Sequence, residues 1–403
     1  MSNQETLPTR PGRTRTTVKR RRFNWILSDW VRRCLKRYVE WSARLKGQRF
    51  YCRALAGQSD YNITINCDLT VSCNCQDYDG SGHLGDLNKQ PFREVFFGPV
   101  AQRFRAELAE GRLPIKTCVR CCELRHIAKA GRMRTDGEDL TPATTPRTDT
   151  GNEASSESSL WGAPTPRLPH LGMLLENTVL CNLDCVGCDR GSAARTRSVM
   201  KMPIENMRRM AELVRELGLE NVFYLNLGEP FLSPNIGLEL RTLREKNPDC
   251  SIVISTNGIV LDTDAKREAA MQASFVYFSI AGVTEPMLRK YEKQGSFERA
   301  YSNMKELAAY RAARRLSRPV IEWKYLLFNW NDRRETIERA IELAKAAGVD
   351  AISFWPTGNP FYGVSFRYRL GFLNDVGVRC WKGREVDLRP AEQATAVPLW
   401  RPR

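Results

Sequence analysis

The chain has 403 residues, 42% hydrophobic and 27% charged, a balance that excludes a fibrous or wholly disordered protein. No apolar run is long enough to span a membrane, and the polar N-terminal residues do not resemble a secretion signal. The net charge of +16 is concentrated in residues 1–50, which hold fourteen Lys or Arg and three Asp or Glu. We therefore expect a cytoplasmic protein of two or three domains with a nearly neutral body.

Residues 1–22 are polar and basic and are predicted to form a disordered tail. Apolar residues then recur at helical spacing, which predicts an amphipathic helix over residues 23–46, with Trp25, Trp30 and Trp41 along or beside the apolar stripe. Such a helix either docks on the rest of the protein, the more common outcome, or makes peripheral contact with a membrane. No nucleic-acid-binding signature accompanies it, so nucleic acid is an unlikely partner.

Residues 50–134 are predicted to form a small cysteine-rich α+β domain. Residues 61–73 alternate like a pair of short strands, and residues 93–111 read as one amphipathic helix. Tight cysteine clusters without a secretion signal favour metal-binding thiolates over disulfides. The seven cysteines of this segment are Cys52, Cys67, Cys73, Cys75, Cys118, Cys121 and Cys122. Residues 135–167 are rich in Ser, Thr, Pro and Gly and are predicted to be a flexible linker.

Residues 168–362 alternate between apolar strand patterns and helical patterns. The six predicted strands lie within residues 171–180, 221–228, 250–258, 274–282, 320–329 and 350–358. Repeated strand–helix units predict an α/β fold with a parallel sheet, and six units favour a partial (β/α)6 TIM-like barrel. Chemistry in such folds lies at the C-terminal ends of the strands. Residues 363–403 lack the pattern and are left as a C-terminal extension.

Three cysteines follow the first of these strands at the spacing C-x3-C-x2-C: Cys181, Cys185 and Cys188. A structural zinc site would need four closed ligands, and no fourth Cys or His lies nearby in the sequence. His170 precedes the strand and is expected at its opposite end. Three thiolates with one open position suit a [4Fe–4S] cluster.

This triplet resembles the motif of the radical S-adenosylmethionine (SAM) superfamily, and the resemblance covers residues 168–360. NLGEPFLSP resembles the family's G-E-P motif, ISTNG its S-T-N-G motif, and YFSIAG its serine-bearing segment. The resemblance implies that the triplet holds the [4Fe–4S] cluster and that Glu229 accepts a hydrogen bond from the SAM amino group. The implied SAM contacts are Gly228, Glu229, Pro230, Ser255, Thr256, Asn257 and Ser279.

The cysteine-rich segment resembles the SPASM auxiliary domain of radical SAM maturases through VSCNCQDYDGSGHLGDL and KTCVRCCELR. In the family this domain normally follows the barrel, whereas here it precedes it. The resemblance implies one or two auxiliary iron–sulfur clusters, and a structural zinc ribbon is the alternative. The ligands expected for a first cluster are Cys52, Cys75, Cys118 and Cys121. The remaining candidates are Cys67, Cys73, Cys122 and, from the C-terminal extension, Cys380.

These resemblances imply an oxidoreductase or maturase that cleaves SAM reductively to a 5′-deoxyadenosyl radical, which abstracts hydrogen from a peptide or protein side chain. A sugar or other small molecule is the alternative substrate, and a non-catalytic iron–sulfur protein for electron transfer or sensing is the alternative class. The expected electron donor is a flavodoxin or ferredoxin. Two isolated cysteines, Cys34 and Cys250, are expected to be core thiols. Candidate pocket residues are Glu322, Lys324, Tyr325 and Trp355, of which strand alternation allows half to face inward.

Overall fold

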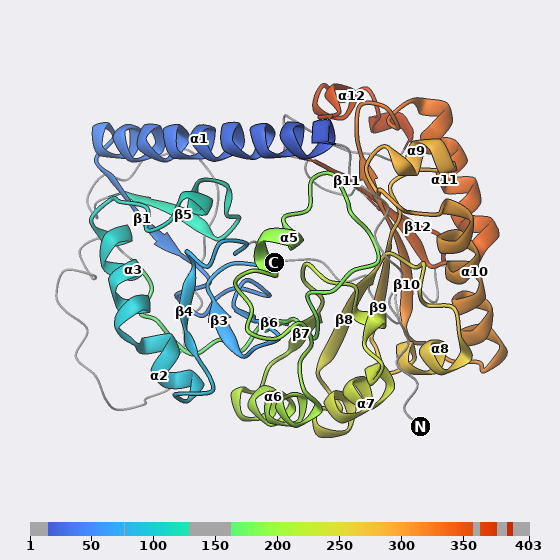
Figure 1. The fold of residues 1–403 in the computed structure, drawn as a ribbon, viewed down its shortest axis with the longest axis horizontal. Coiled ribbons are helices and arrows are strands. Elements are labelled where there is room, and N and C mark those ends of the chain that lie inside the picture. The colour runs from blue at the N-terminus through green and yellow to red at the C-terminus, as the bar shows by residue number, and fades with distance from the viewer. Residues whose placement is uncertain (1–14, 76, 129–162, 358–362, 377–384, 390–403) are drawn as a thin grey trace.

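The computed structural model describes residues 15–75, 77–128, 163–357, 363–376 and 385–389. One mixed sheet of ten strands organises them, in the order β12-β11-β10-β9-β8-β7-β6-β2-β3-β4 (Figure 1). A separate two-stranded sheet pairs β1 (Gln48–Cys52) with β5 (Leu124–Ala128). The chain is therefore a mixed α/β protein built around a single large sheet.

Six strands of the large sheet are parallel and neighbour one another in chain order. This arrangement confirms the predicted α/β class with a parallel sheet. The six strands are β6 (Gly172–Leu175), β7 (Asn221–Tyr224), β8 (Ser251–Thr256), β9 (Phe275–Ser279), β10 (Val320–Leu327) and β11 (Ala351–Pro356).

Helices follow these strands and cover one face of the sheet, its outer face (Figure 1). Alternate residues such as Val222, Ile252 and Ile321 are buried on this side, within the main core. The opposite, inner face carries a second apolar cluster that includes Phe223, Val253 and Tyr277. Successive side chains therefore have different surroundings, as strand geometry requires. The helices are α5 (Arg190–Ala193), α6 (Ile204–Leu217), α7 (Ile236–Lys246), α8 (Asp264–Ala270), α9 (Glu285–Arg289), α10 (Phe297–Ala313), α11 (Arg334–Ala347) and α12 (Phe366–Arg369).

The cysteine-rich segment contains the predicted strand pair, β2 (Thr64–Ile65) and β3 (Thr70–Ser72), followed by β4 (His83–Asp86). The single helix expected over residues 93–111 is instead two helices, α2 (Phe92–Phe97) and α3 (Pro99–Ala109). The break falls at Gly98 because the proline that follows occupies the first turn of α3, where its missing N–H costs nothing.

The cysteine-rich segment shares the large sheet with the parallel strands. Strand β2 pairs in parallel with β6, so that Thr64 lies opposite Leu174. A buried ion pair reinforces this seam, with Arg197 Nε 2.9 Å from a Glu176 carboxylate oxygen. The same arginine donates through Nη2 to Asn66 in the loop between β2 and β3, at 2.7 Å. The two parts of the chain are therefore joined by backbone pairing and a buried salt bridge.

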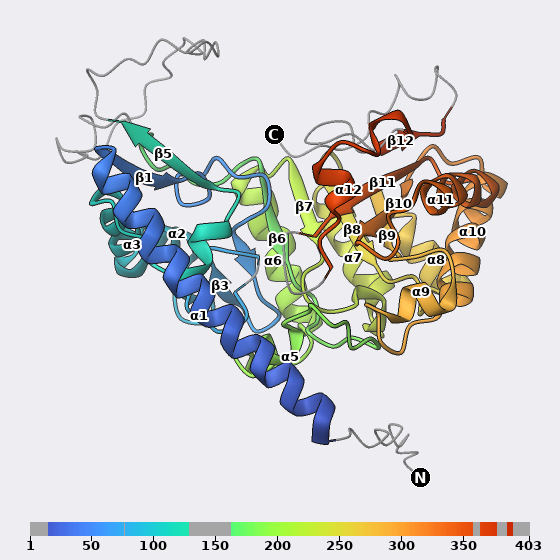
Figure 2. The same cartoon turned by 90° about the horizontal axis from the view of Figure 1, so that it is seen from above.

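The N-terminal helix α1 (Arg15–Leu45) begins before the expected start at residue 23, so residues 15–22 are helical and only residues 1–14 of the predicted tail lie outside the described residues. It packs on β1 and on the short 3-10 helix η1 (Lys116–Arg120). Figure 2 shows α1 along the edge of the N-terminal strands, with its first turns projecting past them. None of the helices described is both long and apolar enough to cross a bilayer.

Part of the C-terminal extension has regular structure. Strand β12 (Glu385–Asp387) pairs antiparallel with β11 and ends the sheet. The candidate ligand Cys380 lies outside the described residues, as does the predicted linker up to residue 162.

Candidate active site and cysteine centres

The C-x3-C-x2-C cysteines lie on the loop between β6 and α5. Two backbone hydrogen bonds join this loop to the segment that follows α9. Asp184 N donates to Lys293 O at 3.1 Å, and Val186 N donates to Tyr291 O at 2.9 Å. The loop is therefore anchored at residues between the cysteines, which restricts where their sulfur atoms can lie.

Burial raises the pKa of all three thiols, that of Cys181 to about 11. The negative charges of Glu292, Cys188 and Cys181 further raise the pKa of Cys185. Metal ligation requires thiolates, and a cationic centre would offset both the burial cost and the mutual repulsion. The donor set therefore fits a positively charged centre bound by three thiolates. Among the residues the structure describes, no three His, Cys, Asp or Glu side chains are grouped closely enough to hold a single metal ion.

Glu229, from the G-E-P motif, connects the ends of β7 and β8 in the buried interior. One carboxylate oxygen accepts from Thr256 Oγ1 at 2.8 Å, and the other accepts from the backbone N–H of Asn257 at 2.7 Å. A third bond comes from Phe231 N at 3.2 Å. Burial nevertheless raises the pKa of Glu229 to about 7, because three hydrogen bonds do not fully offset the loss of water.

The G-E-P loop also lies directly against the cysteine loop. Glu229 N donates to Leu180 O at 2.7 Å. A Cβ atom on Gly228 would lie only 2.0 Å from the carbonyl oxygen of Thr178, so only glycine permits this approach. Pro230 begins a short 3-10 helix and is buried behind the loop.

The S-T-N-G motif and the β9 serine meet at the same edge of the sheet. Ser255 and Ser279 lie with their hydroxyl oxygens 3.1 Å apart. Asn257 Nδ2 donates to Asn182 Oδ1 at 2.8 Å and lies 3.8 Å from Cys181 Sγ. The four motifs predicted from the sequence thus form one continuous surface at the C-terminal ends of the parallel strands.

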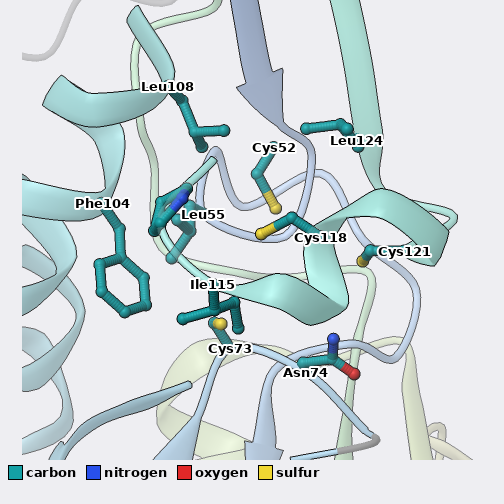
Figure 3. A pocket seen from close by; sticks show the side chains of 11 residues that line it. Cys52, Leu55, Cys73, Asn74, Phe104, Leu108, Ile115, Cys118, Cys121 and Leu124 are labelled. Atoms are coloured by element: carbon teal, nitrogen blue, oxygen red, sulfur yellow. The ribbon is translucent and has the colours of Figure 1, made fainter. Parts of the chain in front are cut away.

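A second group of cysteines lines a pocket in the N-terminal segment. Figure 3 shows Cys52 at the end of β1, Cys118 and Cys121 on or beside η1, and Cys73 just after β3, with Leu108 and Phe104 of α3 closing the side. Burial raises the pKa of Cys52, Cys73 and Cys118, and a hydrogen bond with Cys122, together with burial, raises the pKa of Cys121. Four thiols on one enclosed pocket form a donor set suitable for a metal centre.

Of the expected first-cluster ligands, Cys52, Cys118 and Cys121 line this pocket together with Cys73, whereas Cys75 does not line it. Cys75 instead packs beside the inner-face cluster, where Lys324 lowers its pKa although burial raises it to about 12 overall. Cys122 does not line the pocket either; its Sγ lies 3.2 Å from the Tyr61 hydroxyl, and its thiol is hydrogen-bonded with that of Cys121. Cys67 lies apart from both groups, with its thiol directed at Val199 O at 3.2 Å.

The inner face holds three of the four expected pocket residues on strands β10 and β11, one more than the half that was expected. Lys324 lies over the Trp355 ring at 4.3 Å, and Glu322 accepts a hydrogen bond from Ser353. Tyr325 faces the helices, where its hydroxyl donates to Asn331 O at 3.1 Å, and so it is not a pocket residue. The rule of alternation in strands is confirmed.

Two residues beside the cysteine loop were not predicted. Glu292 is buried, and one of its carboxylate oxygens accepts from Ala281 N at 2.8 Å. Its charge contributes to the raised pKa of Cys185. Asn182 links the cysteine loop to the S-T-N-G motif. No sequence pattern predicts that Glu292 or Asn182 lies beside the cysteine loop. Cys250 is a core thiol as expected, but Cys34 is exposed on α1.

Residues 176–321 match the family model described as the Radical SAM superfamily. This part of the chain is therefore similar to the radical SAM superfamily. The match covers the cysteine triplet, the G-E-P loop, the S-T-N-G motif and the β9 serine, which the structure brings together. The cysteine-rich segment lies outside the matched residues.

No curated protein matches the chain. Solved structures with detectable similarity include anSMEcpe with bound AdoMet and the Cp18Cys peptide, at 16% identity and a TM-score of 0.39 over 52% of this chain. TYW1 with a lysine-pyruvate adduct shows 14% identity and a TM-score of 0.31 over 43% of this chain. Coproporphyrinogen III oxidase from Escherichia coli shows 14% identity and a TM-score of 0.34 over 48% of this chain. The chain spans 60%, 60% and 50% of the lengths of these three chains.

Proposed function

We propose that this protein is a radical SAM enzyme with a [4Fe–4S] cluster bound by Cys181, Cys185 and Cys188. One observation carries the proposal. Glu229 accepts hydrogen bonds from Thr256 and Asn257 of the S-T-N-G motif, and Asn257 donates to Asn182 in the cysteine loop. These bonds join three separate sequence motifs into one site. A site that only stored a metal ion would not need a buried carboxylate beside the thiols.

The surrounding residues have distinct roles in binding SAM. Glu229 has three of its acceptor positions filled by the protein, which leaves capacity for one further donor, the SAM ammonium. Ser255 and Ser279 share one hydrogen bond and retain capacity to bind the ribose or the carboxylate. Thr256 and Asn257 fix the position of Glu229, and Gly228 and Pro230 shape the loop around it. When bound, the cluster supplies the electron for reductive cleavage of SAM to a radical that abstracts hydrogen.

We further propose that the second pocket holds an auxiliary iron–sulfur cluster with Cys52, Cys73, Cys118 and Cys121 as its ligands. The four thiols line a single pocket whose walls are otherwise mostly apolar, and burial of this kind tunes iron–sulfur chemistry. In this proposed ligand set Cys73 takes the place of Cys75, which lies beside the inner face of the large sheet.

The substrate we propose is a peptide or protein side chain, because the cysteine-rich segment resembles the auxiliary domain of maturases. A sugar or other small molecule is the alternative, and a substrate screen distinguishes the two. The electron donor we propose is a flavodoxin or ferredoxin. These choices do not affect the test of the chemistry itself.

The deciding experiment measures iron, sulfide and 5′-deoxyadenosine after anaerobic reconstitution with SAM and dithionite. The wild type should form 5′-deoxyadenosine, and Cys185→Ala should form none. Cys250→Ala is the matched control, since this thiol is buried away from both centres. A wild-type protein that binds SAM and iron but forms no 5′-deoxyadenosine would instead be a non-catalytic iron–sulfur protein.

A further inference from the structure

A half-buried lysine lies on the inner face beside the proposed SAM site. In the parallel register, Lys324 on β10 lies opposite Ser279 on β9 and Ser353 on β11, so these side chains share one face. Its ammonium lies over the Trp355 ring, at 4.3 Å from the ring centre. Cys75 approaches from the N-terminal segment and closes the other side.

This ammonium forms no hydrogen bond or ion pair with the part of the chain that the structure describes. The neighbouring polar groups are bonded to one another. Trp355 Nε1 donates to Ser353 Oγ at 2.7 Å, and Ser353 in turn donates to Glu322. Burial lowers the pKa of Lys324, and the charge of Glu322 acts in the opposite direction. A cation removed from water without an acceptor is costly, so the arrangement favours a ligand that supplies one.

We propose that Lys324, supported by the Trp355 ring, binds an anionic oxygen group, a carboxylate or phosphate, of the molecule that occupies the inner face. This proposal deepens the proposed function, because it gives the substrate an anionic group next to the SAM site. The methionine carboxylate of SAM has the same chemistry and is the second source. The test distinguishes the two.

The experiment measures the rate of acetylation of Lys324 in the full chain by peptide mass spectrometry, with acetate, inorganic phosphate or SAM added separately. Exposed Lys345 is the internal control. Acetate or phosphate should slow labelling of Lys324 but not of Lys345, and SAM should have no effect. Protection by SAM alone would assign the site to its carboxylate. Equal labelling with all three additions would overturn the proposal.

Two variants provide a second readout. Lys324→Met should bind the protecting anion at least about tenfold more weakly, as expected for loss of a charge-assisted hydrogen bond, and Lys324→Arg should retain binding. Because labelling needs no SAM cleavage, failure of the radical chemistry and failure of this site give different results.

An independent observation concerns α1, which meets the protein through both apolar and polar residues. Ala43 is buried in the main core and Val39 packs against it. On the same side, Glu40 accepts from Leu113 N at 2.7 Å and Asp29 is paired with Lys116. The aromatic side of the helix has no partner in the described chain.

The opposite side of α1 exposes a row of large apolar residues spaced along one face: Trp30 (62% exposed), Tyr38 (61%), Trp41 (58%) and Leu45 (67%). Exposed basic residues flank this row: Arg33, Arg37, Arg44 and Lys46. Glu40 is the only acidic residue between Trp30 and Lys46, and it faces inward. Aromatic residues bordered by Arg and Lys are typical of helices that lie in an anionic membrane interface.

We propose that this face of α1 binds the surface of a membrane containing anionic lipids. The test is co-sedimentation of the full chain with vesicles of phosphatidylcholine and phosphatidylglycerol, compared with vesicles of phosphatidylcholine alone. The double variant Trp30→Ser/Trp41→Ser should lower partitioning by about tenfold or more, because it removes apolar surface that would be buried. Phe366→Ser, an equally exposed aromatic on α12, is the control.

Two results would overturn this proposal. The first is that the wild type does not sediment with anionic vesicles. The partner of this face of α1 would then be a protein. The second is that Trp30→Ser/Trp41→Ser binds the vesicles as well as Phe366→Ser does. The membrane contact would then lie elsewhere on the chain. Salt should weaken binding by the wild type, since the flanking charges contribute to it.

Discussion

Replacing Glu229 with Gln should stabilise the metal-free chain at pH 8 and change its stability little at pH 5. Burial raises the pKa of Glu229 from 4.5 to about 7, so the folded chain holds this proton more tightly than the unfolded chain. Stability is therefore greatest below pH 4.5 and falls as the pH rises toward 7. The difference of about 2.5 pKa units corresponds to about 3 kcal/mol. A neutral amide avoids this pH-dependent loss, but its NH2 group cannot accept the hydrogen bonds that both carboxylate oxygens accept, which lowers the gain at pH 8.

The assay is urea unfolding of protein stripped of iron by chelation, at pH 5 and pH 8. Exposed Glu216→Gln is the control and should change stability by less than about 0.5 kcal/mol at either pH. Burial also raises the pKa of Glu292, to about 8, but this residue is present in both proteins and cancels in the comparison. The reasoning fails if wild type and Glu229→Gln lose the same stability between the two pH values.

The same variant should lose affinity for SAM by about 10- to 100-fold in equilibrium dialysis, as expected for a charge-assisted hydrogen bond worth roughly 1.5–3 kcal/mol. A gain in stability together with a loss of binding would show that the buried carboxylate is retained for function. Unchanged SAM affinity would mean that Glu229 only positions the neighbouring loops.

Three further predictions address the cysteines and the seam between the two parts of the chain. Replacing Cys181, Cys185 and Cys188 together with Ala should remove about four irons while the auxiliary iron remains, and unchanged iron would refute the assignment. Cys73→Ser should lose auxiliary iron whereas Cys75→Ser should keep it; zinc without sulfide in the wild type would refute the auxiliary cluster. Arg197→Met should lower the free energy of unfolding by about 3–5 kcal/mol, since it leaves Glu176 buried without its partner. A loss below about 1 kcal/mol would show that water reaches Glu176.

The parallel sheet was predictable because strand and helix periodicity are local properties of the sequence. Each of the six predicted strand segments contains one of β6–β11. Pairing between distant strands is not local, and so the contact of β2 with β6 could not be predicted from either segment. The same is true of α1, whose apolar stripe indicates a helix but not which side meets the protein.

The site could be predicted where a motif fixes the residue and its place at a strand end, as with Glu229 and Ser255. The auxiliary ligands could not, and the C-x-C spacing of Cys73 and Cys75 explains why. Two residues apart in a strand would point to the same side. Strand β3 ends at Ser72, however, and its pairing with β4 is irregular at that point. The two thiols follow the strand into a turn and separate.

Because the two thiols diverge, the proposed auxiliary centre and the proposed substrate site on the inner face lie next to each other. Cys73 lines the auxiliary pocket, and Cys75, two residues later, packs beside the inner face near Lys324. Two residues span at most about 7 Å of chain, so a substrate on the inner face would lie close to the auxiliary centre. An electron left on that substrate after hydrogen abstraction would therefore have a short route to the auxiliary cluster. The parallel pairing of β2 with β6 holds this arrangement in place, which gives the shared sheet a role in function as well as in stability.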